Sequence, residues 1–273
     1  MSPTWHSTTP LPEMPAITLS GWVRVCIKGP LLGGLVFGGL LTLLLLRLIE
    51  KPLFGAHRPC TPYITVFVCR NALRIIGLKL HSGGSPAKTA GALVANHSSW
   101  LDIFVLNATT RLYFVSKSEV AAWPGIGWLA RATGTVFIER NRSKVAQQSE
   151  LFAQRLGAGH RLLFFPEGTS SDGLRVLPFK SSLFAAFFAP DLRGSIQVQP
   201  VSLRYTAPEH ADPRFYGWWG DMDFGPHLLM LLAAPQHGRV DVHYHAPLSV
   251  ASFEDRKTLA LTAEEAIRSG HTA

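Results

Sequence analysis

The chain carries a run of 18 residues without a charged side chain, from Gly29 to Leu46. Lys28 and Arg47 flank this run on its two sides. Its length is at the threshold for a helix that crosses the hydrocarbon core of a bilayer. A secretory signal peptide is the competing interpretation, but the basic residues lie away from the terminus and the run is long for the apolar part of a signal. We therefore expect a membrane-embedded helical segment here.

The composition of the 273-residue chain also favours a membrane-associated protein. Hydrophobic residues make up 47% and charged residues only 16%, which is too apolar for an ordinary soluble domain. The formal net charge of +8 suits nucleic acid, anionic lipid or an acidic carrier protein. Nucleic-acid binding leaves the apolar run unexplained, so we expect no nucleic-acid partner. Three cysteines without a Cys-x-x-Cys pair indicate neither a disulfide framework nor a zinc site.

Further segments surround the apolar run. Residues 1–22 are rich in Pro, Ser and Thr and are expected to be disordered. Tyr63 to Leu80 interleaves apolar residues with Arg and Lys, which is typical of a basic amphipathic helix in a membrane interface. A core helix of the following domain is the alternative. We therefore assign residues 23–82 to a membrane anchor with an interfacial helix, and residues 83–273 to one folded domain that follows the linker 81–86.

Basic residues are distributed unevenly around the apolar run. Arg24 and Lys28 closely precede it, whereas a larger set follows it: Arg47, Lys51, Arg58, Arg70, Arg74 and Lys79. If the segment spans the bilayer, this excess predicts that the following domain faces the cytoplasm. A re-entrant hairpin would leave both flanks cytoplasmic, and the sequence leaves that alternative open.

Strand-like and helix-like segments alternate in the second part of the chain. The expected strands are 92–95, 112–115, 135–139, 161–165, 196–201 and 240–245. The expected helices are 100–108, with Ser98 or Ser99 as its cap, and 125–131, 144–156 and 179–188. This alternation predicts an α/β fold with a mixed, mostly parallel sheet and covering helices, preceded by the membrane-embedded segment.

An imidazole and a carboxylate lie five positions apart in the motif Asn96-His97-Ser98-Ser99-Trp100-Leu101-Asp102. This spacing lets the carboxylate hold one ring nitrogen while the other takes a proton from a substrate hydroxyl. The alternative is a helix-capping histidine beside a solvent-exposed aspartate. A second motif, Phe165-Pro166-Glu167-Gly168-Thr169, follows an apolar run. Loops at the ends of buried strands commonly carry the chemistry of α/β folds.

Together these motifs resemble the glycerolipid acyltransferase family typified by 1-acylglycerol-3-phosphate acyltransferase. The resemblance covers roughly residues 90 to 245, which is most of the chain. Four blocks occur in the family's order: Asn96 to Asp102, Gly134 to Arg140, Phe165 to Thr169 and Val198 to Ser202. One His-x4-Asp motif alone is weak evidence, whereas four ordered blocks in one chain are strong evidence.

The resemblance implies transfer of a fatty acyl chain from a thioester of acyl carrier protein or coenzyme A to the hydroxyl of a lysolipid. His97 is then the general base, and Asp102 fixes its tautomer and stabilises the imidazolium. The thioester is already activated, so no covalent acyl-enzyme, metal or redox cofactor is implied. Substrate-binding roles fall on five residues: Arg140, Glu167, Gly168, Thr169 and Lys180.

These residues bring different chemistry. Arg140 ends an expected strand and can contact an anionic head group bidentately. Gly168 can bring a backbone amide to an oxyanion. Glu167 orients head-group hydroxyls or supports Arg140, with a structural ion pair as the alternative. Lys180 resembles a basic position that often follows the third block, with a snorkelling surface lysine as the alternative.

The third block departs from the family pattern. An arginine that helps to hold a phosphate usually follows its threonine, but Ser170 stands there. Arg175, five positions on, is a candidate replacement. The stretch 172–180 resembles the subgroup that acylates lyso-ornithine lipid, whose head group is a zwitterionic amino acid. We therefore expect lyso-ornithine lipid as the first acceptor and 1-acylglycerol-3-phosphate as the second, and one site can serve both.

Other classes of protein fit the sequence less well. No Gly-x-Ser-x-Gly elbow and no P-loop pattern occur in the sequence. His243 and His245 alternate on an expected strand, which favours a solvated face over a metal site. A non-catalytic membrane scaffold that binds lipid is the main rival, and the presence of His97, Asp102 and Glu167 argues against it. We expect an acyltransferase of the bacterial inner membrane with its catalytic domain facing the cytoplasm.

Overall fold

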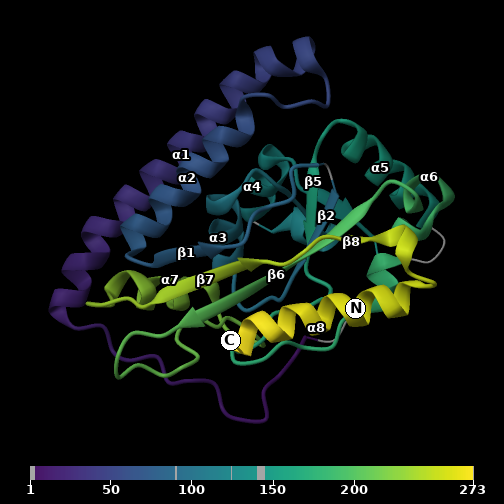
Figure 1. The fold of residues 1–273 in the computed structure, drawn as a ribbon. Coiled ribbons are helices and arrows are strands. Elements are labelled where there is room, and N and C mark those ends of the chain that lie inside the picture. Colours follow the sequence, from purple (N-terminus) through teal and green to yellow (C-terminus); the bar gives the residue numbers. More distant parts are fainter. Residues whose placement is uncertain (1–3, 90, 124, 140–144, 273) are drawn as a thin grey trace.

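The computed structural model describes residues 4–272 except residues 90, 124 and 140–144. A single sheet lies at its centre (Figure 1). Its strands are β1 (Lys79–Gly83), β2 (Gly91–Ala95), β3 (Tyr113–Lys117), β4 (Val136–Ile138), β5 (Arg161–Phe164), β6 (Gln197–Thr206), β7 (Arg239–Tyr244) and β8 (Leu248–Ser249). They are arranged in the order β1-β7-β6-β2-β5-β3-β4, and β8 pairs with β6.

Most neighbouring strands of this sheet run parallel. β2 pairs in parallel with β5 and β6, β3 pairs in parallel with β4 and β5, and β1 pairs in parallel with β7. Among the described residues, only the pairs that β6 forms with β7 and β8 are antiparallel. The predicted mixed, mostly parallel sheet is therefore confirmed. Because β2, β5 and β6 point the same way, their carboxyl ends meet at one edge.

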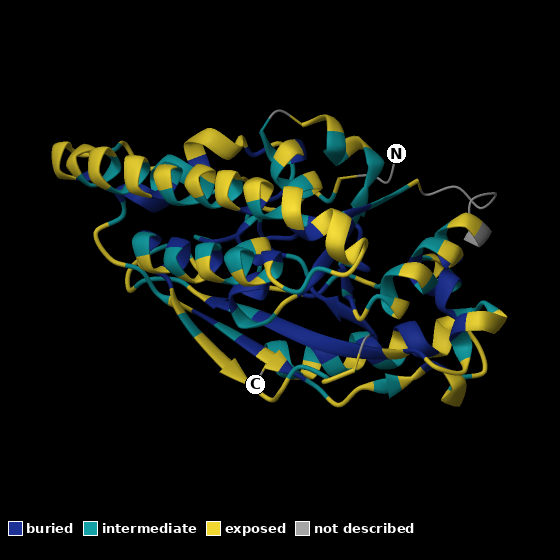
Figure 2. Ribbon diagram, turned by 90° about the horizontal axis from the view of Figure 1, so that it is seen from above, coloured by how far each residue is buried: buried dark blue, intermediate teal, exposed yellow. Residues whose placement is uncertain are grey.

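Helices cover both faces of the sheet. The α-helices are α1 (Leu19–Phe54), α2 (Thr61–Ile76), α3 (Leu101–Thr109), α4 (Ile126–Thr133), α5 (Val145–Gly157), α6 (Pro190–Arg193), α7 (Phe224–Ala233) and α8 (Arg256–Thr272). Short 3-10 helices are η1 (Ser118–Ala122), η3 (Ser181–Phe188) and η4 (Val250–Ser252). One apolar core lies between the sheet and α2, α3 and α7, and a second lies between the sheet and α5, η3 and α8. Figure 2 shows the buried residues concentrated in the sheet between these layers.

α1 is much longer than the apolar run that predicts it. Its 36 residues extend over about 54 Å at a rise of 1.5 Å per residue. Within the described residues it is the one helix long and apolar enough to cross a bilayer. Its most apolar stretch of 18 residues has a mean hydropathy of 2.2, and only 11% of that stretch is buried. A helix this exposed is unlike the core helix of a soluble protein, and Figure 2 shows its outer side in yellow.

α1 and α2 form a hairpin in which one glycine of α1 lies directly against α2. A methyl group at Gly39 would collide with the side chain of Val68, so the two helices approach closely at this point. Gly34 and Gly38 form a Gly-x-x-x-Gly pair, but a methyl group at either would meet nothing within 4 Å. That pair therefore plays no part in the hairpin contact.

α2 packs against the folded domain more closely than the sequence predicts. Cys69, Ala72 and Leu73 are buried on the side that faces the sheet, whereas Tyr63 and Phe67 are 56% and 62% exposed. The alternative interpretation, a core helix, therefore describes one face of α2. The helix also ends earlier than predicted, because Gly77 adopts a left-handed conformation with φ of 102°.

The expected boundary between anchor and catalytic domain also needs correction. β1 lies within residues 79–83, where the sequence predicts the end of a helix and then a linker. It pairs in parallel with β7 and so belongs to the central sheet. The folded domain thus begins before the predicted boundary at residue 83.

The N-terminal segment, residues 4–18, contains no helix or strand but is packed against the domain. In Figure 1 this purple segment runs along the lower edge of the molecule before it enters α1. The Trp5 ring lies 6.4 Å from the buried Trp219 ring, and Arg214 donates to the Pro10 carbonyl at 2.9 Å. Residues 19–22, expected to be disordered, form the first turn of α1, which Thr18 caps through its side chain.

Candidate active site

The site lies at the carboxyl edge of β2, β5 and β6. The side chain of Asn96, directly after β2, accepts a hydrogen bond from the backbone N–H of Leu203 and donates one to its carbonyl, both at 2.8 Å. This amide continues the pairing between β2 and β6 beyond the end of the strand. The main chain is therefore held in position directly before His97.

His97 and Asp102 form the predicted pair. His97 Nδ1 lies 2.7 Å from Asp102 Oδ2, and the Asp102 side chain has no exposed surface. The same oxygen accepts from the backbone N–H groups of Ser98 at 2.8 Å and Ser99 at 3.1 Å. The carboxylate therefore satisfies free amides at the start of α3, where a negative charge is favoured. Of the two serines expected to cap the helix, Ser99 accepts the Leu101 N–H on its hydroxyl at 3.3 Å, so it shares the start of α3 with Asp102. The solvent-exposed aspartate of the alternative interpretation is excluded.

Tyr205 is a member of the site that the sequence analysis missed. Its hydroxyl donates to Asp102 Oδ1 at 2.7 Å. Burial and the neighbouring carboxylate raise the pKa of Tyr205 well above its ordinary value, so the phenol remains a neutral donor. The available signal was the alternation along β6, which puts Val201, Leu203 and Tyr205 on one buried face.

The ring of His97 is held on its face as well as at its edge. It stacks on Phe165, with ring centroids 4.0 Å apart and planes inclined by 11°. The His97 side chain is 21% exposed, and none of the described residues bonds to its Nε2. With Nδ1 occupied by Asp102, Nε2 is the ring atom available to a substrate hydroxyl.

Glu167 supports the main chain of the histidine loop. Its Oε1 accepts the backbone N–H of His97 at 3.0 Å, and the residue is only 1% exposed. Burial raises the pKa of Glu167 well above its ordinary value, against the opposing effect of the His97 N–H. Among the described residues, Glu167 contacts the main chain of His97 and forms no ion pair, so the alternative of a structural ion pair finds no support there.

Gly168 forms the turn of the third block but does not offer its amide to substrate. Its φ is 77°, and its N–H donates to the Phe165 carbonyl at 3.1 Å. The expected contact with an oxyanion is therefore not supported. Thr169 follows directly, and its Oγ1 accepts the backbone N–H of Trp5 at 3.3 Å.

The structure says less about the other positions expected to contact substrate. Lys180 is partly buried, and its backbone N–H donates to the Pro166 carbonyl at 2.9 Å, which closes the loop after β5. Arg140 lies outside the described residues. Ser170, at the position of the family's arginine, is 9% exposed.

The tryptophan of the first motif is anchored to α7. Trp100 Nε1 donates to Nδ1 of His227 at 3.0 Å. His227 is fully buried, and desolvation lowers its pKa to about 4, which keeps the imidazole neutral at neutral pH. Neither the helix α7 nor this contact was expected from the sequence.

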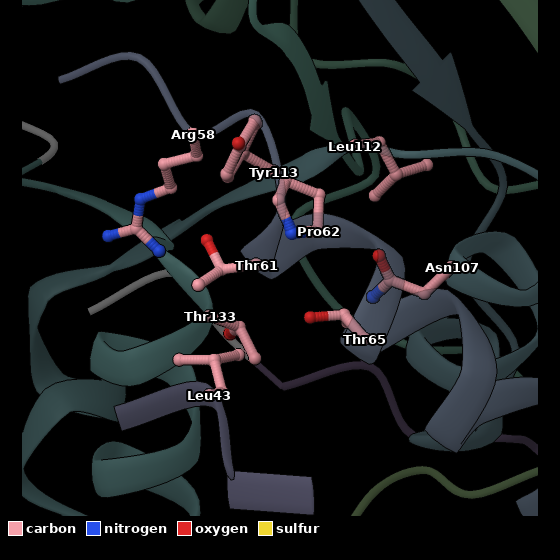
Figure 3. Close-up of a pocket in the computed structure, with 9 residues that line it drawn as sticks. All are labelled: Leu43, Arg58, Thr61, Pro62, Thr65, Asn107, Leu112, Tyr113 and Thr133. Carbon is pink, nitrogen blue, oxygen red and sulfur yellow. The ribbon is translucent and has the colours of Figure 1, made fainter. Parts of the chain in front are cut away.

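Two cavities lie away from His97. The first, between α1, α2 and α4, is lined by residues such as Leu43, Thr61 and Thr133 (Figure 3) and holds about 10 Å³. That volume is at the lower limit for one water molecule, so no lipid fits there. The second is an open groove of about 510 Å³ over β1 and β7. His245 in this groove bonds to the Ser202 hydroxyl at 2.7 Å.

Known proteins share this sequence and fold. A family model described as acyltransferase matches residues 80–204. The chain is 53% identical to the lyso-ornithine lipid O-acyltransferase of Rhodobacter capsulatus, over 98% of this chain and 97% of that one. It is 34% identical to the 1-acyl-sn-glycerol-3-phosphate acyltransferase of Neisseria gonorrhoeae, over 73% and 77% of the two chains.

The crystal structure of the 1-acyl-sn-glycerophosphate acyltransferase PlsC from Thermotoga maritima has the same fold. The TM-score is 0.62 at 22% identity, and the match covers 92% of this chain and 93% of that one. The overall fold of this chain is therefore a known architecture. The chain belongs to the PlsC-like acyltransferase family, in which lyso-ornithine lipid O-acyltransferases are its relatives over nearly the whole length.

Proposed function

We propose that the protein transfers a fatty acyl chain from a thioester to the hydroxyl of a lysolipid, with lyso-ornithine lipid as its first acceptor. The observation that carries this proposal is the 2.7 Å contact between His97 Nδ1 and a fully buried Asp102, which leaves Nε2 for the substrate. This is the arrangement that general-base catalysis needs.

The reaction follows from that geometry. His97 Nε2 takes the proton of the acceptor hydroxyl while the hydroxyl oxygen bonds to the thioester carbonyl carbon. Asp102 stabilises the imidazolium that forms, and Tyr205 holds Asp102 in place. When the tetrahedral intermediate collapses, the C–S bond breaks and the imidazolium returns its proton to the thiolate. The products are an ester and a free thiol, and His97 regains its starting state.

Two observations favour lyso-ornithine lipid as the acceptor. Relatives at 53% and 39% identity, from Rhodobacter capsulatus and Brucella abortus, are lyso-ornithine lipid O-acyltransferases. This chain also has Ser170 at the position where the family usually has an arginine that helps to hold a phosphate. The relative from Neisseria gonorrhoeae supports 1-acylglycerol-3-phosphate as the second candidate.

The donor and the location belong to the same proposal. An acyl carrier protein or coenzyme A thioester supplies the chain, and α1 embeds the protein in the bacterial inner membrane with the catalytic domain facing the cytoplasm. The exposed apolar surface of α1 and the basic residues that follow its apolar run support this arrangement.

Membranes that carry the protein test the proposal directly. Each lysolipid is supplied with a labelled acyl thioester, and the labelled product is measured against membranes that carry the His97→Ala variant. We expect product from lyso-ornithine lipid at least as fast as from 1-acylglycerol-3-phosphate at matched concentration. Product from 1-acylglycerol-3-phosphate alone would assign the protein to the second candidate, and product from neither would reject both.

A further inference from the structure

The loop after β5 carries an arginine whose guanidinium is fixed in position. Arg175 Nε donates to Asp172 Oδ1 at 3.2 Å, and Arg175 Nη2 lies 2.9 Å from Asp172 Oδ2 in an ion pair. The Asp172 side chain is 1% exposed, whereas that of Arg175 is 50% exposed. A two-point contact with a buried carboxylate orients the guanidinium and leaves its outer side accessible for a further anion.

The backbone of this arginine is tied to the catalytic histidine through one residue. Ser171 donates its N–H to the His97 carbonyl at 2.9 Å and its hydroxyl to the Arg175 carbonyl at 3.2 Å. The loop that carries the guanidinium is therefore set by the same contacts that set His97. Such a link suits a group that positions a substrate for the reaction.

Trp5 of the N-terminal segment covers the same arginine. Its ring centroid lies 5.5 Å from Arg175 Cζ, which is within the range of a cation–π contact. Its backbone N–H reaches Thr169, and its ring approaches the buried Trp219. The N-terminal segment thus places an aromatic side chain, Trp5, against the loop after β5, which resembles the acceptor-binding block of the family.

We propose that Arg175, oriented by Asp172 and covered by Trp5, binds the anionic part of the acceptor head group, which in lyso-ornithine lipid is the carboxylate. This inference rests on the proposed function. It explains how Ser170 can stand where relatives in the family have an arginine, because Arg175 supplies a positive charge from the same loop. A phosphate offers the same anionic chemistry, so the test includes both head groups.

The first experiment compares Arg175→Gln with a matched control in full-length protein. Arg239 is also paired with an aspartate, Asp241 at 3.0 Å, and is 51% exposed, but it lies on β7 over the open groove. For Arg175→Gln we expect the KM for lyso-ornithine lipid to rise about tenfold, as for loss of a charge-assisted contact. The KM for the thioester should not change, and Arg239→Gln should behave like the wild type.

The second experiment changes the substrate instead of the enzyme. Lyso-ornithine lipid with its carboxylate converted to a methyl ester should be about tenfold poorer for the wild type, and Arg175→Gln should not distinguish acid from ester. Trp5→Ala should raise the KM for the acid about threefold. With 1-acylglycerol-3-phosphate, a rise in KM in Arg175→Gln assigns the arginine to both anions, and an unchanged KM assigns it to the carboxylate.

An unchanged acceptor KM in Arg175→Gln, or equal use of acid and ester by the wild type, would overturn the inference. A lower kcat with an unchanged KM would also overturn it, since the arginine would then only support the loop. Arg175→Lys keeps the charge and should recover part of the affinity, which separates a lost contact from a lost fold. Failure of the wild type to acylate any lysolipid would instead reject the proposed function.

Discussion

Asp102 is the residue on which the contacts of the site converge. Four donors reach its carboxylate: the His97 ring, the Tyr205 hydroxyl and the backbone N–H groups of Ser98 and Ser99. A buried carboxylate needs such partners, because an uncompensated charge in the interior is very costly. The imidazole is therefore held in one tautomer and one orientation before substrate binds.

Loss of either member of the pair should abolish most of the activity. His97→Ala removes the base, and we expect acyl transfer to fall about 10²-fold or more. Asp102→Asn should also be severely impaired, because the amide no longer fixes the tautomer. The rates are measured on protein whose thermal unfolding is checked in parallel. Near-normal turnover by a folded His97→Ala protein would contradict the mechanism.

Removal of the Tyr205 hydroxyl should act on Asp102 alone. Tyr205→Phe keeps the ring but leaves Oδ1 without its donor, and we expect a loss of about 1.5–3 kcal/mol in unfolding free energy. Acyl transfer should fall less than in His97→Ala. Tyr244→Phe is the control, since the partner of its hydroxyl among the described residues is Thr109, at 2.6 Å, and not a residue of the site. Equal activity losses in the two variants would show that Tyr205 has no special relation to the site.

An arginine at position 170 should move the acceptor preference. Ser170→Arg adds a cation where the family usually has one, and a charge-assisted contact with phosphate is worth roughly 1.5–3 kcal/mol. The ratio of rates with 1-acylglycerol-3-phosphate and lyso-ornithine lipid should therefore rise about tenfold or more. The shift should be larger in the double variant that also carries Arg175→Gln. An unchanged ratio in both variants would show that position 170 does not face the head group.

At the scale of elements, the sequence predicts the strands β2 to β7 but misses β1 and β8, and it predicts the packing of helices less well. Short apolar runs bounded by turn residues locate β2, β5 and β6, and the parallel sheet then brings His97 beside Glu167. The helix α7 was missed because its sequence is apolar on nearly all sides and shows no helical period. The helix α8 was also missed, although it does carry such a period, in Leu259, Ala263 and Ile267.

The residue contacts that the sequence could not predict join distant segments. Tyr205 meets Asp102 across 103 positions, and Trp5 meets Thr169 across 164. Neither pair belongs to a local motif, so spacing along the chain carries no sign of it. Local motifs predict the pair of His97 and Asp102, whereas the tertiary fold selects the groups that hold this pair.

The α1–α2 hairpin should depend on one glycine and not on its neighbour. Gly39→Ala places a methyl group against Val68, and we expect a cost of about 1–3 kcal/mol from overpacking. Gly38→Ala meets nothing and should stabilise the helix by up to about 1 kcal/mol. Thermal inactivation in detergent compares the two variants. Equal stability of both would contradict the close approach at Gly39.

At the scale of the whole molecule, α1 is fastened to the domain along its length. The contacts are Arg24 with Ala233, Lys28 with Ile76, Gly39 with Val68 and Glu50 with Thr61. The opposite side of the helix exposes large apolar residues: Phe37, Leu41, Leu44, Leu45 and Leu48. If this side of α1 lies in a bilayer, the bilayer surface is directly beside the folded domain.

Membrane binding through this surface should resist salt. Apolar burial is not screened by ions, so the full-length protein should stay in the membrane fraction at high ionic strength. Replacement of Leu41, Leu45 and Leu48 by serine should release part of it. Recovery of folded wild-type protein in the high-salt soluble fraction would refute membrane embedding.

In the membrane arrangement proposed above, the side-on attachment of α1 also determines how the acceptor is supplied. A lysolipid that stays in the leaflet beside α1 reaches the enzyme by lateral diffusion in two dimensions. The quantity that governs its rate is then its mole fraction among the surrounding lipids, not its concentration in the bulk. Dilution with inert lipid slows such an enzyme even when the total amount of lysolipid is constant, whereas a water-soluble thioester donor is unaffected.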